Sequence, residues 1–178
     1  MSQHQITRQS VIQGECFVSA DPFLQYSTIL GSCVAVCMFD ADAMVGGMNH
    51  FLLPGVVDDN MRDMKYGVYS MELLINGLLK LGADRFNLKA KIFGGSTINN
   101  SSQQIGLKNQ AFTREFLRNE SIPVLVENMG GNYARKLQFT PSTGKVRHLL
   151  IPSDKPIQED LSPPRLPPLE IKSDIEMF

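Results

Sequence analysis

An apolar run in the N-terminal third of the chain reads Ile29-Leu30-Gly31-Ser32-Cys33-Val34-Ala35-Val36-Cys37-Met38-Phe39. It is rich in β-branched residues and has no polar residues at helical spacing, which is typical of a strand buried on both faces. A second apolar run, from Met44 to Leu53, follows the turn residues Ala41-Asp42-Ala43 and stops at Pro54. Two such runs joined by a short turn predict a β-hairpin.

The sequence around this hairpin predicts two helices and several further strands. Apolar residues recur every three or four positions from Tyr69 to Leu81, and Asn109 is a plausible N-cap for a second helix. Between the hairpin and the first helix, the polar stretch 54–65 predicts a loop. Extended segments are expected at residues 11–18, 86–93, 123–126, 133–139 and 146–151, of which 123–126 reads as a buried strand.

Strands joined mostly by hairpins, with two helices among them, predict an α+β fold. We expect a layered, mixed or antiparallel β-sheet sandwich with two main helices packed on it. After residue 151 the composition changes, and the run Ser162-Pro163-Pro164-Arg165-Leu166-Pro167-Pro168-Leu169 is compatible with neither helix nor sheet. We therefore expect one domain over residues 1–151 and an extended, proline-rich tail over residues 152–178.

Composition narrows the class of protein. The 178 residues are 43% hydrophobic and 20% charged, which is ordinary for a globular domain. The net charge is -1, from 17 basic and 18 acidic residues, which does not indicate binding to nucleic acid or to an anionic membrane surface. No apolar run has the length of a signal peptide or a membrane span, so we expect a cytoplasmic protein without membrane insertion.

The three cysteines are Cys16, Cys33 and Cys37, and their odd number and spacing disfavour a disulfide framework or a zinc site. Each is therefore either core filler or reactive. Gly31 and Ser32 before Cys33 allow a close backbone approach, which suits a nucleophile. Free cysteine is nevertheless among the most buried residue types, so spacing alone favours a core position for all three.

His50 is the histidine that lies inside a predicted apolar element. If the runs of Cys33 and His50 pair, the two side chains could meet and form the minimal thiol and imidazole pair of a cysteine nucleophile. A core histidine bonded to a backbone carbonyl is the alternative, and the pattern does not decide between them. The groups that could orient the imidazole are Ser27, Thr28 and Asn49.

Several blocks of sequence, taken in order, carry a resemblance to a known family. They are Leu30-Gly31-Ser32-Cys33-Val34-Ala35-Val36, Gly46-Gly47-Met48-Asn49-His50-Phe51-Leu52-Leu53-Pro54, Lys89-Ala90-Lys91-Ile92-Phe93-Gly94-Gly95, Ile105-Gly106 with Asn109, and Gly130-Gly131 followed by Arg135, Phe139 and Thr143-Gly144. Over roughly residues 10 to 150 the chain resembles the chemoreceptor glutamine deamidases of the CheD family.

This resemblance implies a protein-glutamine glutaminase that converts glutamines of methyl-accepting chemotaxis receptors to glutamate through a cysteine thioester. It implies that Cys33 is the nucleophile and His50 the general base. The family's third catalytic group is a threonine just upstream of the cysteine, which corresponds to Ser27 or to the adjacent Thr28. The chemistry needs no metal or organic cofactor.

Two other functions share these residues. The resemblance also implies a possible CheC-type phosphatase partner, so the chain could be a weakly catalytic or non-catalytic module that binds receptors or the phosphatase. A thiol protease or transglutaminase would form the same acyl-enzyme and differ in the bond attacked or in the acceptor. Product analysis separates these possibilities.

Overall fold

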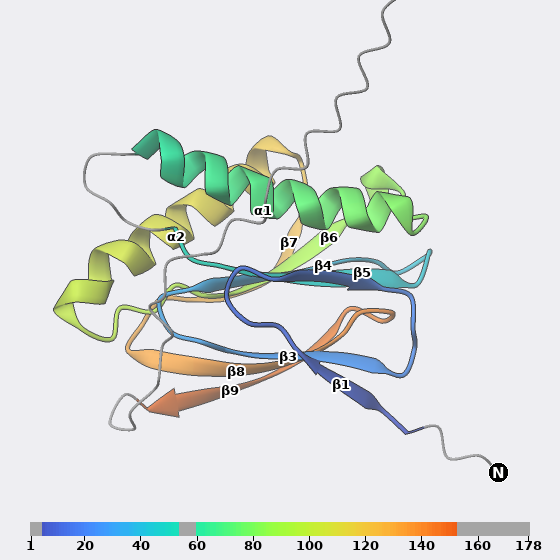
Figure 1. Cartoon of the computed structure of the whole chain (residues 1–178), viewed down its shortest axis with the longest axis horizontal. Helices are drawn as coiled ribbons and strands as arrows, with labels where there is room; N and C mark the ends of the chain where they lie inside the picture. Colours follow the sequence, from blue (N-terminus) through green and yellow to red (C-terminus); the bar gives the residue numbers. More distant parts are fainter. Residues whose placement is uncertain (1–4, 54–59, 153–178) are drawn as a thin grey trace, which may run out of the picture.

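A computed structural model describes residues 5–53 and 60–152 of the chain. Within them, two helices, a five-stranded sheet and a four-stranded sheet form three stacked layers (Figure 1), which confirms the predicted α+β sandwich. Pro152 is the last residue of the last strand. Apart from that residue, the proline-rich tail lies outside the described residues.

The five-stranded sheet is the middle layer. In sheet order its strands are β2 (Cys16–Ser19), β5 (Val45–Phe51), β4 (Val34–Asp40), β6 (Lys89–Gly94) and β7 (Val124–Met129). Neighbouring strands are antiparallel except for β6 and β7. The predicted hairpin is confirmed as β4 and β5, both of which are buried along their whole length.

The four-stranded sheet is the outer β layer. Its strands, in sheet order, are β1 (Thr7–Ser10), β3 (Leu24–Leu30), β8 (Tyr133–Thr140) and β9 (Lys145–Pro152). Strands β1 and β3 are parallel, whereas the other two pairs are antiparallel. The predicted closing hairpin is therefore confirmed as β8 and β9.

Three of the predicted strands differ from the structure. The run Ile29 to Phe39 is two strands in different sheets, because the chain bends at residues 31–33 and crosses from β3 to β4. Residues 11–15 are a loop. Residues 123–126 were expected to be buried, but they lie at or beside the edge strand β7, where Leu125 is 51% exposed.

Helix α1 (Asn60–Lys80) and helix α2 (Asn100–Asn119) cover the face of the five-stranded sheet that points away from the other sheet (Figure 1). Both are longer than predicted. Helix α1 begins inside the expected polar loop, of which residues 54–59 lie outside the described part. The N-cap of α2 is Asn99, which forms a capping box with Ser102, so the prediction of Asn109 as the cap is wrong.

Strand β6 begins at Lys89 and not at Phe86 as predicted, because residues 85–87 form a 3₁₀ turn, η1 (Arg85–Asn87), which Asp84 caps.

Two apolar cores separate the layers. One lies between the helices and the five-stranded sheet, and includes Val34, Val36 and Leu74. The other lies between the two sheets and includes Cys33. Alternate residues of β4 thus serve different cores.

Candidate active site

Cys33 lies at the bend where the chain leaves one sheet for the other. Each of the three carbonyls of this bend accepts a hydrogen bond from a distant segment. The amides of Gly95 and Ser96 donate to the carbonyls of Cys33 and Gly31, at 2.7 and 2.9 Å. Asn109 Nδ2 donates to the carbonyl of Ser32 at 2.9 Å. These bonds hold the backbone that carries the thiol in one place.

Gly94 allows β6 to approach this bend closely. It has φ +110°, and a Cβ built on it would lie 2.1 Å from the carbonyl oxygen of Cys33. Any side chain at this position would therefore displace the bend. Gly94 and Gly95 therefore fix the position of the Cys33 backbone, the first by its close packing and the second by its hydrogen bond.

His50 lies on β5, on the same face as the thiol. Ala35 of β4 pairs with His50, and Val34 pairs with Phe51, so continuing this register puts Cys33 diagonally across from His50. Such diagonal neighbours have Cα atoms about 7–8 Å apart, which long side chains can span. Cys33 and His50 are each 6% exposed, between the two sheets.

Thr28 and a backbone carbonyl orient the imidazole. His50 Nδ1 lies 2.9 Å from Thr28 Oγ1 and 3.1 Å from the carbonyl oxygen of Val11. Thr28 Oγ1 donates its own proton to Val11 at 2.6 Å, so it accepts from Nδ1–H. That arrangement assigns the Nδ1–H tautomer and leaves Nε2 with a lone pair. Nε2 has no hydrogen-bond partner within the described part of the chain.

Burial also favours the neutral form of this histidine. Desolvation lowers the pKa of His50 below 6.5, although the hydrogen bond that Nδ1–H donates to the Val11 carbonyl and the charge of Glu15 partly oppose the shift. At neutral pH the ring is therefore uncharged and can act as a base. Nδ1 is thus hydrogen-bonded, Nε2 has a free lone pair, and the Cys33 thiol lies on the same face of the sheet as the ring.

The other cysteines and the remaining orienting candidates do not contact His50 through any hydrogen bond in the described part of the chain. Burial raises the pKa of Cys16 to about 12 and also raises that of Cys37, so both thiols are protonated at neutral pH. Ser27 alternates with Thr28 along β3 and shares its face with Ile29, which is 52% exposed. Asn49 faces α1, where Nδ2 donates to the carbonyl of Ser70.

Sequence reasoning missed two features that touch this site. Residues 11–15 contribute the Val11 carbonyl and also Gln13, whose Oε1 accepts from Cys33 Sγ at 3.4 Å. Asn109 is fully buried in α2 and bridges the bend to Leu53, whose amide donates to Asn109 Oδ1 at 2.9 Å. A polar residue on the buried face of an amphipathic helix is the signal that could have identified Asn109.

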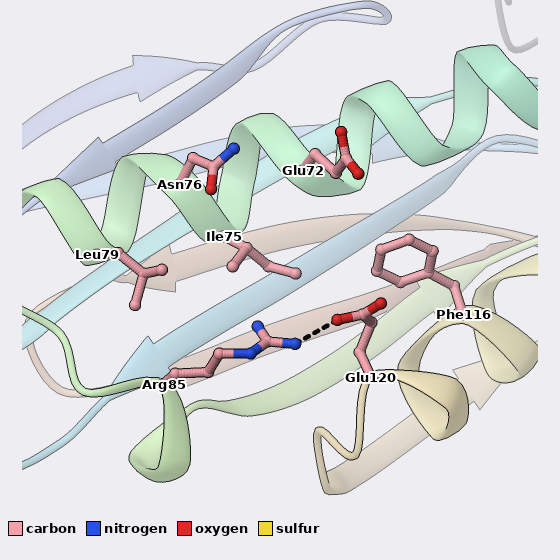
Figure 2. A pocket seen from close by; sticks show the side chains of 7 residues that line it. All are labelled: Glu72, Ile75, Asn76, Leu79, Arg85, Phe116 and Glu120. Carbon is pink, nitrogen blue, oxygen red and sulfur yellow. Dashed lines mark hydrogen bonds and ion pairs between the residues drawn. The ribbon is translucent and has the colours of Figure 1, made fainter.

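A separate pocket of about 340 Å³ lies on the opposite face of the five-stranded sheet, between α1, α2 and η1 (Figure 2). Arg85 and Glu120 form an ion pair across it, and Ile75, Leu79 and Phe116 supply apolar walls. None of the predicted site residues lines this pocket.

Residues 5–53 and 60–152 contain no group of three or more histidine, cysteine or acidic side chains placed to hold a metal ion. No helix in the same ranges is both long enough and apolar enough to cross a membrane.

Comparison with known proteins places the chain in a family. The family model described as CheD chemotactic sensory transduction matches residues 52–148. A protein of Rhizobium meliloti (strain 1021) is 48% identical over 96% of this chain and 96% of its own length, and one of Caulobacter sp. (strain K31) is 46% identical over 94% and 91%. Both are named "Probable chemoreceptor glutamine deamidase CheD".

Among solved structures, Bacillus licheniformis hypothetical protein YfiH matches 71% of this chain and 60% of its own length, with a TM-score of 0.43 and 14% identity. That likeness is too weak to bear on the fold. The family match and the two relatives together cover most of the described residues. The chain therefore belongs to the CheD family of chemotactic sensory transduction proteins.

Proposed function

We propose that this chain is a protein-glutamine deamidase that converts glutamines of methyl-accepting chemotaxis receptors to glutamate. Cys33 is the nucleophile, His50 is the general base, and Thr28, rather than Ser27, orients the imidazole. The observation that carries the proposal is the hydrogen bonding of His50. Nδ1 forms hydrogen bonds with Thr28 Oγ1 and the Val11 carbonyl, whereas Nε2 has no hydrogen-bond partner in the described part of the chain. The imidazole ring lies on the same face of the sheet as the Cys33 thiol.

The first half of the reaction forms a thioester. His50 Nε2 takes the thiol proton, and Cys33 Sγ forms a bond to the side-chain carbonyl carbon of the substrate glutamine. His50 then returns the proton to the substrate nitrogen, the carbon–nitrogen bond breaks, and ammonia leaves. Thr28 and the Val11 carbonyl stabilise the imidazolium that forms in between, since both accept from Nδ1–H.

The second half releases glutamate. Water replaces ammonia, His50 Nε2 takes a proton from it, and the resulting hydroxide attacks the thioester carbon. The carbon–sulfur bond breaks, the sulfur recovers its proton, and a glutamate side chain remains on the substrate. No redox change occurs. The relatives' names and the family match support receptor glutamines as the substrate class.

The direct test incubates the purified chain with receptor cytoplasmic fragments and follows peptide masses over time. We expect glutamine-to-glutamate conversion with wild type and none with Cys33→Ala. Equal rates for the two proteins would refute the role of Cys33. Cys37→Ala is the matched control, because that thiol lies in the same inter-sheet core and is fully buried.

The same experiment tests the alternative functions. Chain cleavage would indicate a protease, and incorporation of an added amine would indicate a transglutaminase. A His50→Ala protein that still binds receptors and supports normal signalling would indicate a binding module.

On the family resemblance we also propose a CheC-type phosphatase as a partner and a cytoplasmic location, where receptor signalling helices are found. Co-purification with such a phosphatase, where the cell has one, tests the partner.

We further propose that residues 1–151 form the deamidase domain and that the proline-rich residues 152–178 take no part in the chemistry. Residues 5–53 and 60–152 already contain both sheets, both helices and every proposed catalytic side chain. A chain ending at Pro152 should therefore deamidate receptor fragments at the wild-type rate. A large loss of the rate would assign the tail to the active enzyme.

A further inference from the structure

A glutamine of the chain itself lies against the nucleophile. Gln13 Oε1 accepts a hydrogen bond from Cys33 Sγ at 3.4 Å, and the Gln13 side chain is half-buried. The group that contacts the thiol is thus a primary carboxamide, which is the functional group that the proposed reaction consumes. The contact joins residues 20 positions apart in the chain.

The segment that carries Gln13 is fastened to the site by its backbone. The Gly14 amide donates to the carbonyl of His50 at 2.7 Å, and the His50 amide donates to the carbonyl of Glu15 at 3.0 Å. The Val11 amide donates to the carbonyl of Ser27 at 2.8 Å. Gln13 lies between these anchors, so the fold determines where its side chain begins.

A turn within the segment sets the position of Gln13 further. Glu15 Oε2 accepts from the Ile12 amide at 2.9 Å, and the Glu15 amide donates to the carbonyl of Ile12 at 3.0 Å. Gly14 has φ +91°, which glycine adopts without strain. These contacts fix the conformation of the loop beside Cys33 and His50.

The geometry of the contact is that of a bound but unreactive carboxamide. Attack requires sulfur to approach the carbonyl carbon, whereas here the carboxamide oxygen faces the thiol and accepts a hydrogen bond from it. Cys33 is only 6% exposed while this contact is made. The thiol that a substrate carboxamide would have to reach is therefore covered in the resting protein, and the Gln13 side chain is one of the groups in contact with it.

We propose that Gln13 is an internal substrate mimic: in the resting protein it holds the Cys33 thiol, and a substrate glutamine must displace it before reaction. The inference rests on the proposed function for the identity of the displaced substrate. The contact itself belongs to the resting protein and can be tested without any substrate.

The test measures the rate at which iodoacetamide alkylates Cys33, resolved by peptide mass spectrometry, in wild type, Gln13→Ala and Gln13→Asn. Asparagine keeps the carboxamide but is one methylene shorter, so it should not reach the sulfur. We expect both variants to speed alkylation of Cys33 by about 2- to 10-fold, the factor that corresponds to losing one neutral hydrogen bond. Cys16 reports on general loosening and should react at an unchanged rate.

Two outcomes would overturn the proposal. Alkylation of Cys33 that is unchanged or slower in both variants would show that Gln13 does not shield the thiol. Conversion of Gln13 to glutamate in wild type but not in Cys33→Ala would show that its carboxamide is productively placed, contrary to the contact described. Thermal unfolding of the variants checks that they are folded.

The deamidation assay separates this inference from the proposed function. If Gln13 competes with substrate, Gln13→Asn should lower the KM for receptor fragments, whereas kcat changes little. If wild type does not deamidate receptors at all, the proposed function fails while the alkylation result still decides the role of Gln13. If receptors are deamidated and alkylation is unchanged, the mimic alone is refuted.

Discussion

Replacing Thr28 with valine removes one hydroxyl from the buried cluster around His50 and keeps the side-chain shape. Thr28 is 7% exposed, and its oxygen contacts both His50 Nδ1 and the carbonyl of Val11. That carbonyl keeps its 3.1 Å contact with Nδ1 in the variant, so it is not left without a partner. We therefore expect only about 1 kcal/mol of lost stability.

The effect on catalysis should be larger because His50 becomes charged during the reaction. A hydrogen bond to a charged group contributes about 1.5–3 kcal/mol, and each 1.36 kcal/mol is tenfold in rate, so kcat should fall by about 10- to 150-fold. The assay is single-turnover deamidation of a receptor fragment, followed by mass spectrometry. Thr28→Ser, which keeps a hydroxyl, should recover most of the rate.

Ser27→Ala is the matched control, since this neighbouring hydroxyl shares its face with the exposed Ile29. We expect its rate to stay within about twofold of wild type and its unfolding free energy within about 0.5 kcal/mol. A Thr28→Val protein that stays within about twofold of the wild-type rate, while thermal unfolding shows it folded, would refute the orienting role of Thr28. A collapse of the rate in Ser27→Ala would move the orienting role to Ser27.

Asn109→Leu leaves the Ser32 carbonyl and the Leu53 amide without the side chain that bonds both, so the free energy of unfolding in urea should fall by about 2–4 kcal/mol. An unchanged unfolding midpoint would count against this bridging role of Asn109. Gly94→Ala should cost at least about 2 kcal/mol more than Gly82→Ala, because both glycines have positive φ but only at Gly94 does the new methyl group meet the carbonyl of Cys33. Because burial lowers the pKa of His50 below 6.5, its neutral form persists as the pH falls to that value. The acidic limb of the rate profile should therefore lie below pH 6.5, and a limb well above it would contradict the assigned environment.

Much of the fold could be predicted from hydropathy. The pairing of β4 with β5 and of β8 with β9 follows from apolar runs flanking short turns, and the centre of α1 follows from its periodicity. The crossing between sheets at residues 31–33 could not be predicted, because apolar residues flank it on both sides and its immediate neighbours, Leu30 and Val34, are both fully buried. Hydropathy records burial and does not record which sheet buries a residue.

The polar first turns of the helices were missed for a related reason. Asp63, in the first turn of α1, is almost fully buried and pairs with Lys108 in the middle of α2, so a polar residue near the start of one helix is buried against the other helix. From the sequence, such residues resemble a loop. The long polar stretch before Asn109 misled the prediction of α2 in the same way.

For the site, the sequence and the family resemblance together named Cys33 and His50 as candidates, whereas the proposal of Thr28 over Ser27 rests on contacts that the sequence does not reveal. Adjacent strand residues point to opposite faces, and here Thr28 is buried while the more apolar Ile29 is half exposed. The hydropathy pattern therefore gave no guide to the buried face. The contact of Gln13 with Cys33 likewise depends on a loop path that no local pattern predicts.

Trapping the acyl-enzyme tests the proposed mechanism most directly. The chain is mixed with a glutamine peptide from a receptor, quenched in acid on the timescale of one turnover, and mapped by peptide mass spectrometry. We expect an adduct on Cys33 with the mass of the peptide less ammonia, sensitive to hydroxylamine and absent from Cys33→Ala. An adduct on another residue, or glutamate formed by Cys33→Ala at the wild-type rate, would contradict the mechanism.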